Sequence, residues 1–274
     1  MTPTTAVAAE LPLPIVLATA TRERARTVLK RAFPRRRTAL GFCRTAVELG
    51  EALRRELVDA VVVDIGQPGD DTWQAVAMAR DFPSIPFFGL GPSRVADGPA
   101  MARCADAEFV DVITEGMDDA WVRELVLPYA FTARFAAALR DAPSALGLQA
   151  PLQQEAWRAI IRFGGRTVRT ETLALQLGVT REHLSRSFAA SGAPNLKRII
   201  DLVRLIAAAE LSKNPGYDVG DVARVLDFAS PSHLGSTALR IVGARTASLA
   251  RLRTVDLIGR FGQGRGRSRR ASGS

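Results

Sequence analysis

The first half of the chain alternates short apolar runs with segments in which apolar residues recur every three or four positions. The runs are PIVLATA at 14–20, TALGFC at 38–43, DAVVVDI at 59–65, IPFFGLG at 85–91 and FVDVIT at 109–114. Runs without polar alternation predict strands buried on both faces, and the segments between them have the length of crossover helices. We therefore predict an α/β domain over 14–140, doubly wound around a five-stranded parallel sheet.

The second half has a purely helical pattern that begins after a small-residue, Pro-containing linker at 141–151. The stretch TETLALQLGVTREHLSRSF at 170–188 predicts two short helices joined by a tight turn at Gly178. Thr170 and Thr180 are the expected caps, and Leu184 and Phe188 lie one turn apart on the predicted buried side. Two short helices at a glycine turn are typical of a helix-turn-helix, whose second helix enters the major groove of DNA.

The same pattern returns about fifty residues later, as DVGDVARVLDFASPSHLGSTAL at 218–239. Asp227 takes the place of the turn glycine, and Ser230 followed by Pro231 predicts the start of the second helix of this pair. Between the two copies, 195–212 predicts one helix that ends before Asn214-Pro215-Gly216. At ~1.5 Å per residue this helix would span ~27 Å, close to the ~34 Å repeat of B-DNA.

The charge of the chain is concentrated in the second half. Residues 1–150 hold 17 basic and 19 acidic residues, whereas 151–274 hold 20 and 9, a net charge of +11. This asymmetry favours a polyanion as the partner of the C-terminal domain. The 274 residues include two cysteines, no CxxC motif and no apolar stretch of membrane-spanning length, so we expect a cytoplasmic protein without disulfides or bound metal. Residues 1–13 predict a disordered leader, and the Gly/Arg-rich stretch 257–274 a disordered basic tail.

The stretch DAVVVDIGQPGDD at 59–71 resembles the third strand and following loop of a response-regulator receiver domain, with Asp64 at the phosphoacceptor position. The resemblance implies a magnesium ion held by an acidic pair after the first strand, a hydroxyl after the fourth strand and a lysine after the fifth. Here Thr19 and Ala20 stand at the acidic pair, Gly91 at the hydroxyl and Glu115 at the lysine. Because metal and cation are needed to meet the phosphoryl charge, we expect Asp64 to be inactive.

The double motif of 152–256 resembles the DNA-binding domain of AraC-type transcription regulators. The first motif matches over LALQLGVTREHLSRSF, the intervening helix at Arg204, Leu205 and Ala208, and the second motif at FASPSHL. The resemblance implies base contacts from the exposed face of each recognition helix. The candidate DNA-binding residues of the first motif are Arg181, Glu182, Ser185 and Arg186. Arginine can donate to guanine O6 and N7, and glutamate can accept from cytosine N4.

The second copy departs from the family pattern, because Ser236 and Ala238 replace an arginine and a phenylalanine, and Gly235 lies inside the helix. The candidates for DNA contact in this copy are Ser232, His233, Ser236 and Thr237. The sequence thus predicts a transcription regulator that binds double-stranded DNA and is associated with the nucleoid. RNA polymerase is a further expected partner. The sequence predicts no enzyme, since no nucleophile–base pair, metal cluster or phosphate-binding loop is present. The alternatives are a phosphorylation-controlled response regulator and a protein-interaction adaptor that does not bind DNA.

The end of the first domain predicts a homodimer. Residues 118–140 begin with two aspartates suited to a helix N-terminus, and Pro128 should kink or split the helix. The segment carries more apolar side chains than one side of a sheet needs to cover, and these side chains are Trp121, Leu125, Tyr129, Phe131 and Phe135. The competing interpretation is a helix that covers its own domain and leads into the linker.

Overall fold

The computed structural model describes residues 11–92, 98–190 and 193–271, with side chains described to 263. The first ten residues of the predicted leader lie outside these ranges. No helix among the described residues is long and apolar enough to cross a membrane.

The α/β part is a five-stranded parallel sheet of strand order β2-β1-β3-β4-β5, which confirms the predicted fold class. The strands are β1 (Ile15–Thr19), β2 (Ala39–Cys43), β3 (Ala60–Asp64), β4 (Phe87–Gly91) and β5 (Asp111–Thr114). Every residue of β3 and β4 is buried, as expected for a sheet covered on both faces. The strand order reverses between β1 and β3, and ligands of such sheets bind at the carboxyl ends of the strands near this point.

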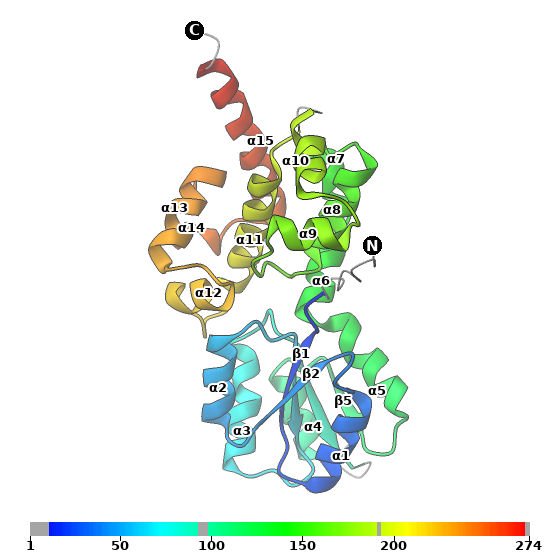
Figure 1. Cartoon of the computed structure of the whole chain (residues 1–274). Coiled ribbons are helices and arrows are strands. Elements are labelled where there is room, and N and C mark those ends of the chain that lie inside the picture. Colours follow the sequence, from blue (N-terminus) through cyan, green and yellow to red (C-terminus); the bar gives the residue numbers. More distant parts are fainter. Residues whose placement is uncertain (1–10, 93–97, 191–192, 272–274) are drawn as a thin grey trace, which may run out of the picture. The chain divides into compact units, whose positions relative to one another are not determined.

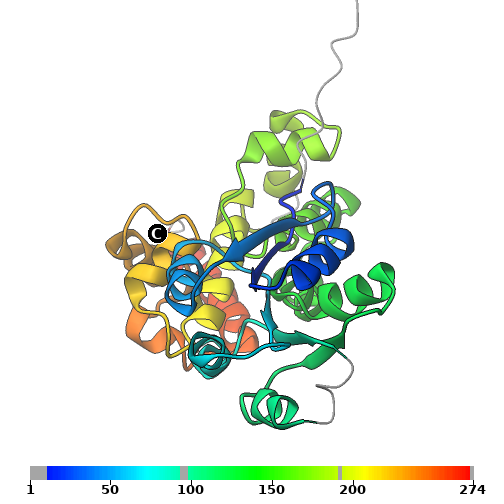
Figure 2. The ribbon, with the colours of Figure 1, turned by 90° about the horizontal axis from the view of Figure 1, so that it is seen from below.

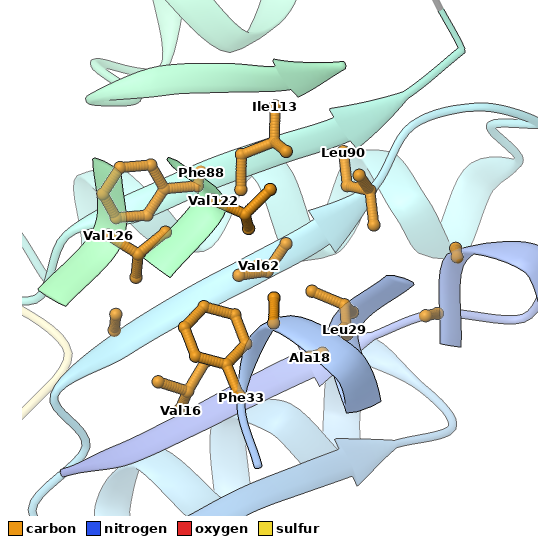
Figure 3. Close-up of a cluster of buried hydrophobic side chains, with 14 residues drawn as sticks. Val16, Ala18, Leu29, Phe33, Val62, Phe88, Leu90, Ile113, Val122 and Val126 are labelled. Carbon is orange, nitrogen blue, oxygen red and sulfur yellow. The ribbon is translucent and has the colours of Figure 1, made fainter. Parts of the chain in front are cut away.

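Helices cover both faces of this sheet (Figures 1 and 2). They are α1 (Glu23–Ala32), α2 (Ala46–Arg55), α3 (Asp70–Ala77), the 3-10 turn η1 (Met78–Arg80), α4 (Pro99–Asp106) and α5 (Asp119–Val126). Figure 3 shows the core between the sheet and helices α1 and α5, where Leu29 and Phe33 meet Val62 and Phe88. Helices α2 and α3 lie on the opposite face (Figure 2).

A buried carboxylate ties the start of the sheet to the helix that leads out of the domain. Asp59 is fully buried, and its side chain accepts hydrogen bonds from the backbone N–H groups of Ile15 and Thr132, each at 2.9 Å. The hydroxyl of Thr132 donates a further bond, at 2.6 Å. Three donors satisfy a charge that would otherwise be costly to bury.

The segment that follows α5 is split at Pro128, as the sequence predicts. A 3-10 turn, η3 (Leu127–Tyr129), separates α5 from α6 (Phe131–Ala138). Asp118 caps α5 by accepting from the N–H of Ala120 at 2.8 Å.

The rest of the described chain is helical. The helices are α7 (Ala142–Leu146), α8 (Pro151–Ile161), α9 (Thr170–Gln176), α10 (Arg181–Ala190), α11 (Leu196–Leu211), α12 (Val219–Val225), α13 (Pro231–Val242), α14 (Thr246–Leu249) and α15 (Thr254–Ala271). The predicted linker therefore contains a short helix, α7. Leu257 and Phe261 of α15 are fully buried. The prediction of disorder from residue 257 is wrong for these turns, because two apolar side chains one turn apart give the helix a packing face.

The compact units of the structure do not follow the linear order of the chain. One unit comprises Leu13–Arg134 together with Leu211–Val225, and the other comprises Met1–Pro12, Phe135–Glu210 and Leu226–Ser274. We call them the receiver-like unit and the helical unit. The segment with α12 belongs to the receiver-like unit, although it lies beyond the predicted linker at 141–151.

Candidate phosphoacceptor position and nucleic-acid interface

The carboxylate of Asp64 lies at the carboxyl end of β3 and is paired with an arginine. Arg22, which precedes α1, directs its Nε to both oxygens of Asp64, at 2.9 and 3.1 Å, and its Nη2 also bonds Oδ1. The Nη1 of the same guanidinium lies 2.5 Å from Oε1 of Glu115, at the end of β5. Only 3% of the Asp64 side chain and 2% of the Glu115 side chain are exposed. One guanidinium therefore pairs with two buried carboxylates, and Arg24 adds a second cation, with its Nε 3.0 Å from Oε2 of Glu115.

The neighbourhood of Arg22 is shaped to accept its guanidinium. Burial lowers the pKa of Arg22, but hydrogen bonds and charges from Asp64 and Glu115 outweigh it, and the net shift is upward. A Cβ on Gly66 would lie 2.2 Å from Cζ of Arg22, so only glycine leaves room for the guanidinium here. Gly66 also donates its N–H to Oδ1 of Asp64 at 3.0 Å.

These residues do not fit the magnesium site that a receiver resemblance implies. Magnesium requires several oxygen ligands in near-octahedral geometry, whereas Thr19 and Ala20 stand at the position of the acidic pair. The guanidinium of Arg22 holds both oxygens of Asp64. Asp71, one of the two acids that follow Asp64 in the loop, instead accepts from the N–H of Ala46 at the start of α2, at 2.9 Å. The sequence alone shows that the acidic pair is absent and that Glu115 stands at the lysine position. It does not show that Arg22 connects Asp64 with Glu115.

The first helix-turn-helix has the predicted local geometry. Helix α9 ends at a turn in which Gly178 has φ +65°, and α10 begins with the hydroxyl of Thr180 accepting from the N–H of His183 at 3.1 Å. The first cap differs, because α9 begins with Arg169 at the capping position and Thr170 inside the helix. Leu184 and Phe188 are fully buried, as predicted.

The opposite face of α10 carries the four candidate residues of the first motif. Arg181, Glu182, Ser185 and Arg186 are all exposed. Arg181 forms an exposed ion pair with Glu171 of α9 at 3.2 Å. Such surface pairs contribute at most about 1 kcal/mol, so Arg181 can leave Glu171 for a phosphate or a base. The structure thus brings the four residues together on one accessible helix face.

The second recognition helix, α13, has fewer charged candidate residues than α10. Ser230 caps it by accepting from the N–H of His233 at 3.1 Å, and Pro231 occupies the first turn, both as predicted. Ser232, His233 and Ser236 are exposed, but Thr237 is only 2% exposed. Thr237 is therefore wrong as a DNA-contact candidate. It lies three residues after the buried Leu234 and so shares its inward face.

Arg240 is not among the predicted DNA-contact residues, although it lies one turn after Ser236 on the exposed side of α13. Its Nη2 lies 2.9 Å from Oδ2 of Asp201 on α11, with 53% of the arginine side chain exposed. The signal was the four-residue spacing from Ser236, which places Arg240 on the same face.

Arg204 of α11 organises the turn before α13. Its Nη2 donates to the carbonyls of Leu226 and Asp227, at 2.9 and 3.0 Å, and its guanidinium lies 3.9 Å from the ring centre of Phe228. Asp227 has the left-handed conformation expected at the glycine position, with φ +55°. The buried arginine therefore fixes this turn rather than contacting a ligand.

Comparisons with known proteins give structural similarity only. No family model and no curated protein matches the sequence. The structure is similar to a response regulator from Thermotoga maritima, with 20% sequence identity and a TM-score of 0.37 over 43% of this chain and 98% of that one. It is also similar to full-length FixJ from B. japonicum, with 13% identity and a TM-score of 0.37 over 73% of this chain and 97% of that one. RcsB from Salmonella enterica serovar Typhimurium, solved bound to the promoter rprA with BeF3-, has 14% identity and a TM-score of 0.34 over 69% and 98%.

Proposed function

We propose that this protein is a sequence-specific, DNA-binding transcription regulator of the AraC type. The observation that carries the proposal is the division of α10 into two faces. Leu184 and Phe188 anchor the helix in the helical unit, while Arg181, Glu182, Ser185 and Arg186 are exposed together. A capped helix with two arginines on its free face suits insertion into the major groove of DNA.

The spacing of the two motifs supports the same function. Helix α11 joins them with 16 residues, which corresponds to ~24 Å at ~1.5 Å per residue. The net charge of +11 over 151–274 adds attraction to phosphate that does not depend on base sequence. We infer a cytoplasmic, nucleoid-associated protein with RNA polymerase as a further partner, and a binding role rather than an enzymatic one.

We further propose that the receiver-like unit does not transfer phosphate. The guanidinium of Arg22 already occupies the oxygens of Asp64, and Glu115 would repel an incoming phosphoryl group. The receiver-like unit instead serves dimerisation or the sensing of a partner. Control by phosphorylation is the second candidate function, favoured only by the position of Asp64 at the carboxyl end of β3.

The test uses the full chain and duplex DNA selected by that chain from a random-sequence pool. Arg186→Ala should weaken binding to the selected duplex more than binding to unselected duplex, by ~1–3 kcal/mol if Arg186 contacts a base. Arg36→Ala is the matched control, because it removes the same charge from an exposed position of the receiver-like unit. Affinity for both duplexes should fall steeply as salt concentration rises.

The outcomes separate the candidate functions. Equal loss on both duplexes would assign Arg186 to a phosphate contact. Failure of the wild-type chain to enrich any sequence, with no salt-dependent binding to duplex DNA, would favour the adaptor function. Equal effects of Arg186→Ala and Arg36→Ala would remove α10 from the interface.

A further inference from the structure

The segment Leu211–Val225, which contains α12, is built into the receiver-like unit. Asn214 is 1% exposed, and its Oδ1 accepts from the N–H of Ser84 at 2.7 Å. Two residues later, the N–H of Gly216 donates to the carbonyl of Asp81 at 2.8 Å. The segment thus makes backbone-directed hydrogen bonds to the loop between η1 and β4, which is 130 or more residues away in sequence.

A second set of contacts uses the C-terminal end of α2. The hydroxyl of Tyr217 donates to the carbonyl of Leu53 at 3.0 Å, and Nη1 of Arg224 donates to the carbonyl of Arg54 at 3.1 Å. The last carbonyls of a helix lack partners within the helix and carry partial negative charge, so these donors satisfy groups that would otherwise need water. Burial raises the pKa of Tyr217 well above its ordinary value, so its hydroxyl remains a donor at all physiological pH values.

The backbone of this segment approaches an aromatic ring without leaving room for a side chain. A Cβ on Gly216 would lie 2.5 Å from the ring of Phe82. The ring of Tyr217 meets Phe82 edge-on, with centroids 4.9 Å apart. We call residues 214–217, with Arg224, the clasp. Its contacts with α2 and Phe82 are close-packed and specific, unlike those of an incidental surface contact.

We infer that the clasp lets the receiver-like unit position α12, the first helix of the second helix-turn-helix, for DNA. This inference rests on the proposed DNA-binding function. Ser232, His233 and Ser236 of α13, the second helix of the motif, are exposed. The clasp therefore fixes the first helix of the motif, α12, within the receiver-like unit.

Positioning makes the two units energetically coupled. A partner or ligand that moves the end of α2 or the loop at 81–84 changes the anchorage of α12. By reciprocity, DNA bound through the second motif should stabilise the contacts of the clasp. The receiver-like unit would then act on DNA recognition through α2 and Phe82, without any change at Asp64.

The experiment compares the full chain with Gly216→Ala, Tyr217→Phe and the control Gly69→Ala. The first variant forces a Cβ against Phe82, and the second removes only the hydroxyl that bonds Leu53. Gly69 lies in the same unit with φ −117°, and a Cβ there meets nothing within 4 Å. Amide hydrogen exchange across 214–225 and footprinting on a duplex selected by the wild type are measured for each protein.

We expect Gly216→Ala to speed exchange throughout 214–225 and at Ser84, and Tyr217→Phe to do so more weakly. The footprint should shorten to the part under the first motif, with Kd raised on the order of tenfold. Gly69→Ala should match the wild type. Unchanged footprint and affinity in a variant whose 214–225 amides exchange faster would overturn the inference, and tighter binding would replace positioning by occlusion. Absence of DNA binding by the wild type would refute the proposed function, and the positioning role with it, whereas exchange at 214–225 would still report on the clasp itself.

Discussion

Arg22 and Asp64, 42 residues apart in the chain, form a two-point ion pair at the carboxyl edge of the sheet, with Nε 2.9 and 3.1 Å from the two carboxylate oxygens. The same guanidinium forms an ion pair with Glu115 at the end of β5. The cation of this site therefore comes from the loop after β1, and the end of β5 supplies an anion. Arg24 also pairs with Glu115, so two cations face the two carboxylates of this site.

Removal of this cation should be strongly destabilising. Arg22→Ala leaves Asp64 and Glu115 as two buried carboxylates that have lost their shared partner. Breaking a buried pair in this way costs about 3–5 kcal/mol of unfolding free energy. Urea denaturation of the full chain, followed by circular dichroism, measures the effect.

Arg24→Ala is the matched control for that experiment. Nε of Arg24 lies 3.0 Å from Oε2 of Glu115, but 75% of its side chain is exposed. Its loss should therefore cost less than about 1 kcal/mol. Equal destabilisation by the two variants would show that Arg22 is not the cation on which the site depends.

Phosphoryl donors should leave Asp64 unmodified. Acetyl phosphate with magnesium is expected to give no mass increase in the intact protein, because Arg22 holds the nucleophilic oxygens and no acidic pair binds the metal. Intact-mass spectrometry of wild type and Asp64→Asn measures this. A phosphoryl adduct present in the wild type and absent from Asp64→Asn would establish phosphotransfer.

The local pattern of the sequence was sufficient for most of the fold. All five strands are predicted, since each lies in a short, mainly apolar run. Gly178 and Asp227 mark turns because they adopt positive φ, and Ser230 marks a helix cap. The ion pair at Asp64 was not predicted, because the arginine that forms it is far away in sequence. Gly66, directly after the strand, was a usable signal, since a glycine there permits a close approach to Asp64.

Two further differences between prediction and structure have separate causes, one local and one long-range. Thr237 is polar and was assigned to the surface, but the helical period places it on the buried side of α13. The motif places the segment 211–225 in the C-terminal domain, and only the three-dimensional contacts show that it packs against α2 and the loop at 81–84 of the receiver-like unit. Linear motifs identify which helices form but do not determine which unit holds them.

Gly235 should be a weak point of the second recognition helix. It lies inside α13, and a Cβ at this position would be 3.7 Å from Cγ2 of Thr246, an ordinary contact. Gly235→Ala should therefore raise the free energy of unfolding by about 1 kcal/mol. Gly243→Ala is the opposed control, because Gly243 ends the helix with φ +64°, and alanine there should cost about 1–2 kcal/mol. Stabilisation by both variants, measured by denaturant unfolding, would contradict this account.

The exposed side of α5 is the surface through which we expect the full chain to form a homodimer. Trp121 is 70% exposed and Tyr129 46%, whereas Phe131 and Phe135 are buried in the structure. The apolar surface available to a partner is thus smaller than the sequence suggested, and it centres on Trp121. Because a buried tryptophan contributes large contact area at low entropic cost, one charge at this position should separate the subunits.

Light scattering of the full chain at micromolar concentrations provides the measurement. The wild type should have the mass of a dimer, and Trp121→Arg should have that of a monomer with unchanged circular dichroism. Val47→Arg is the matched control, since Val47 is a 65% exposed apolar residue on α2 of the same unit and should tolerate the charge without loss of the dimer. A monomeric wild type would refute the prediction. Dissociation by Val47→Arg but not by Trp121→Arg would place the dimer interface on the α2 side of the sheet instead.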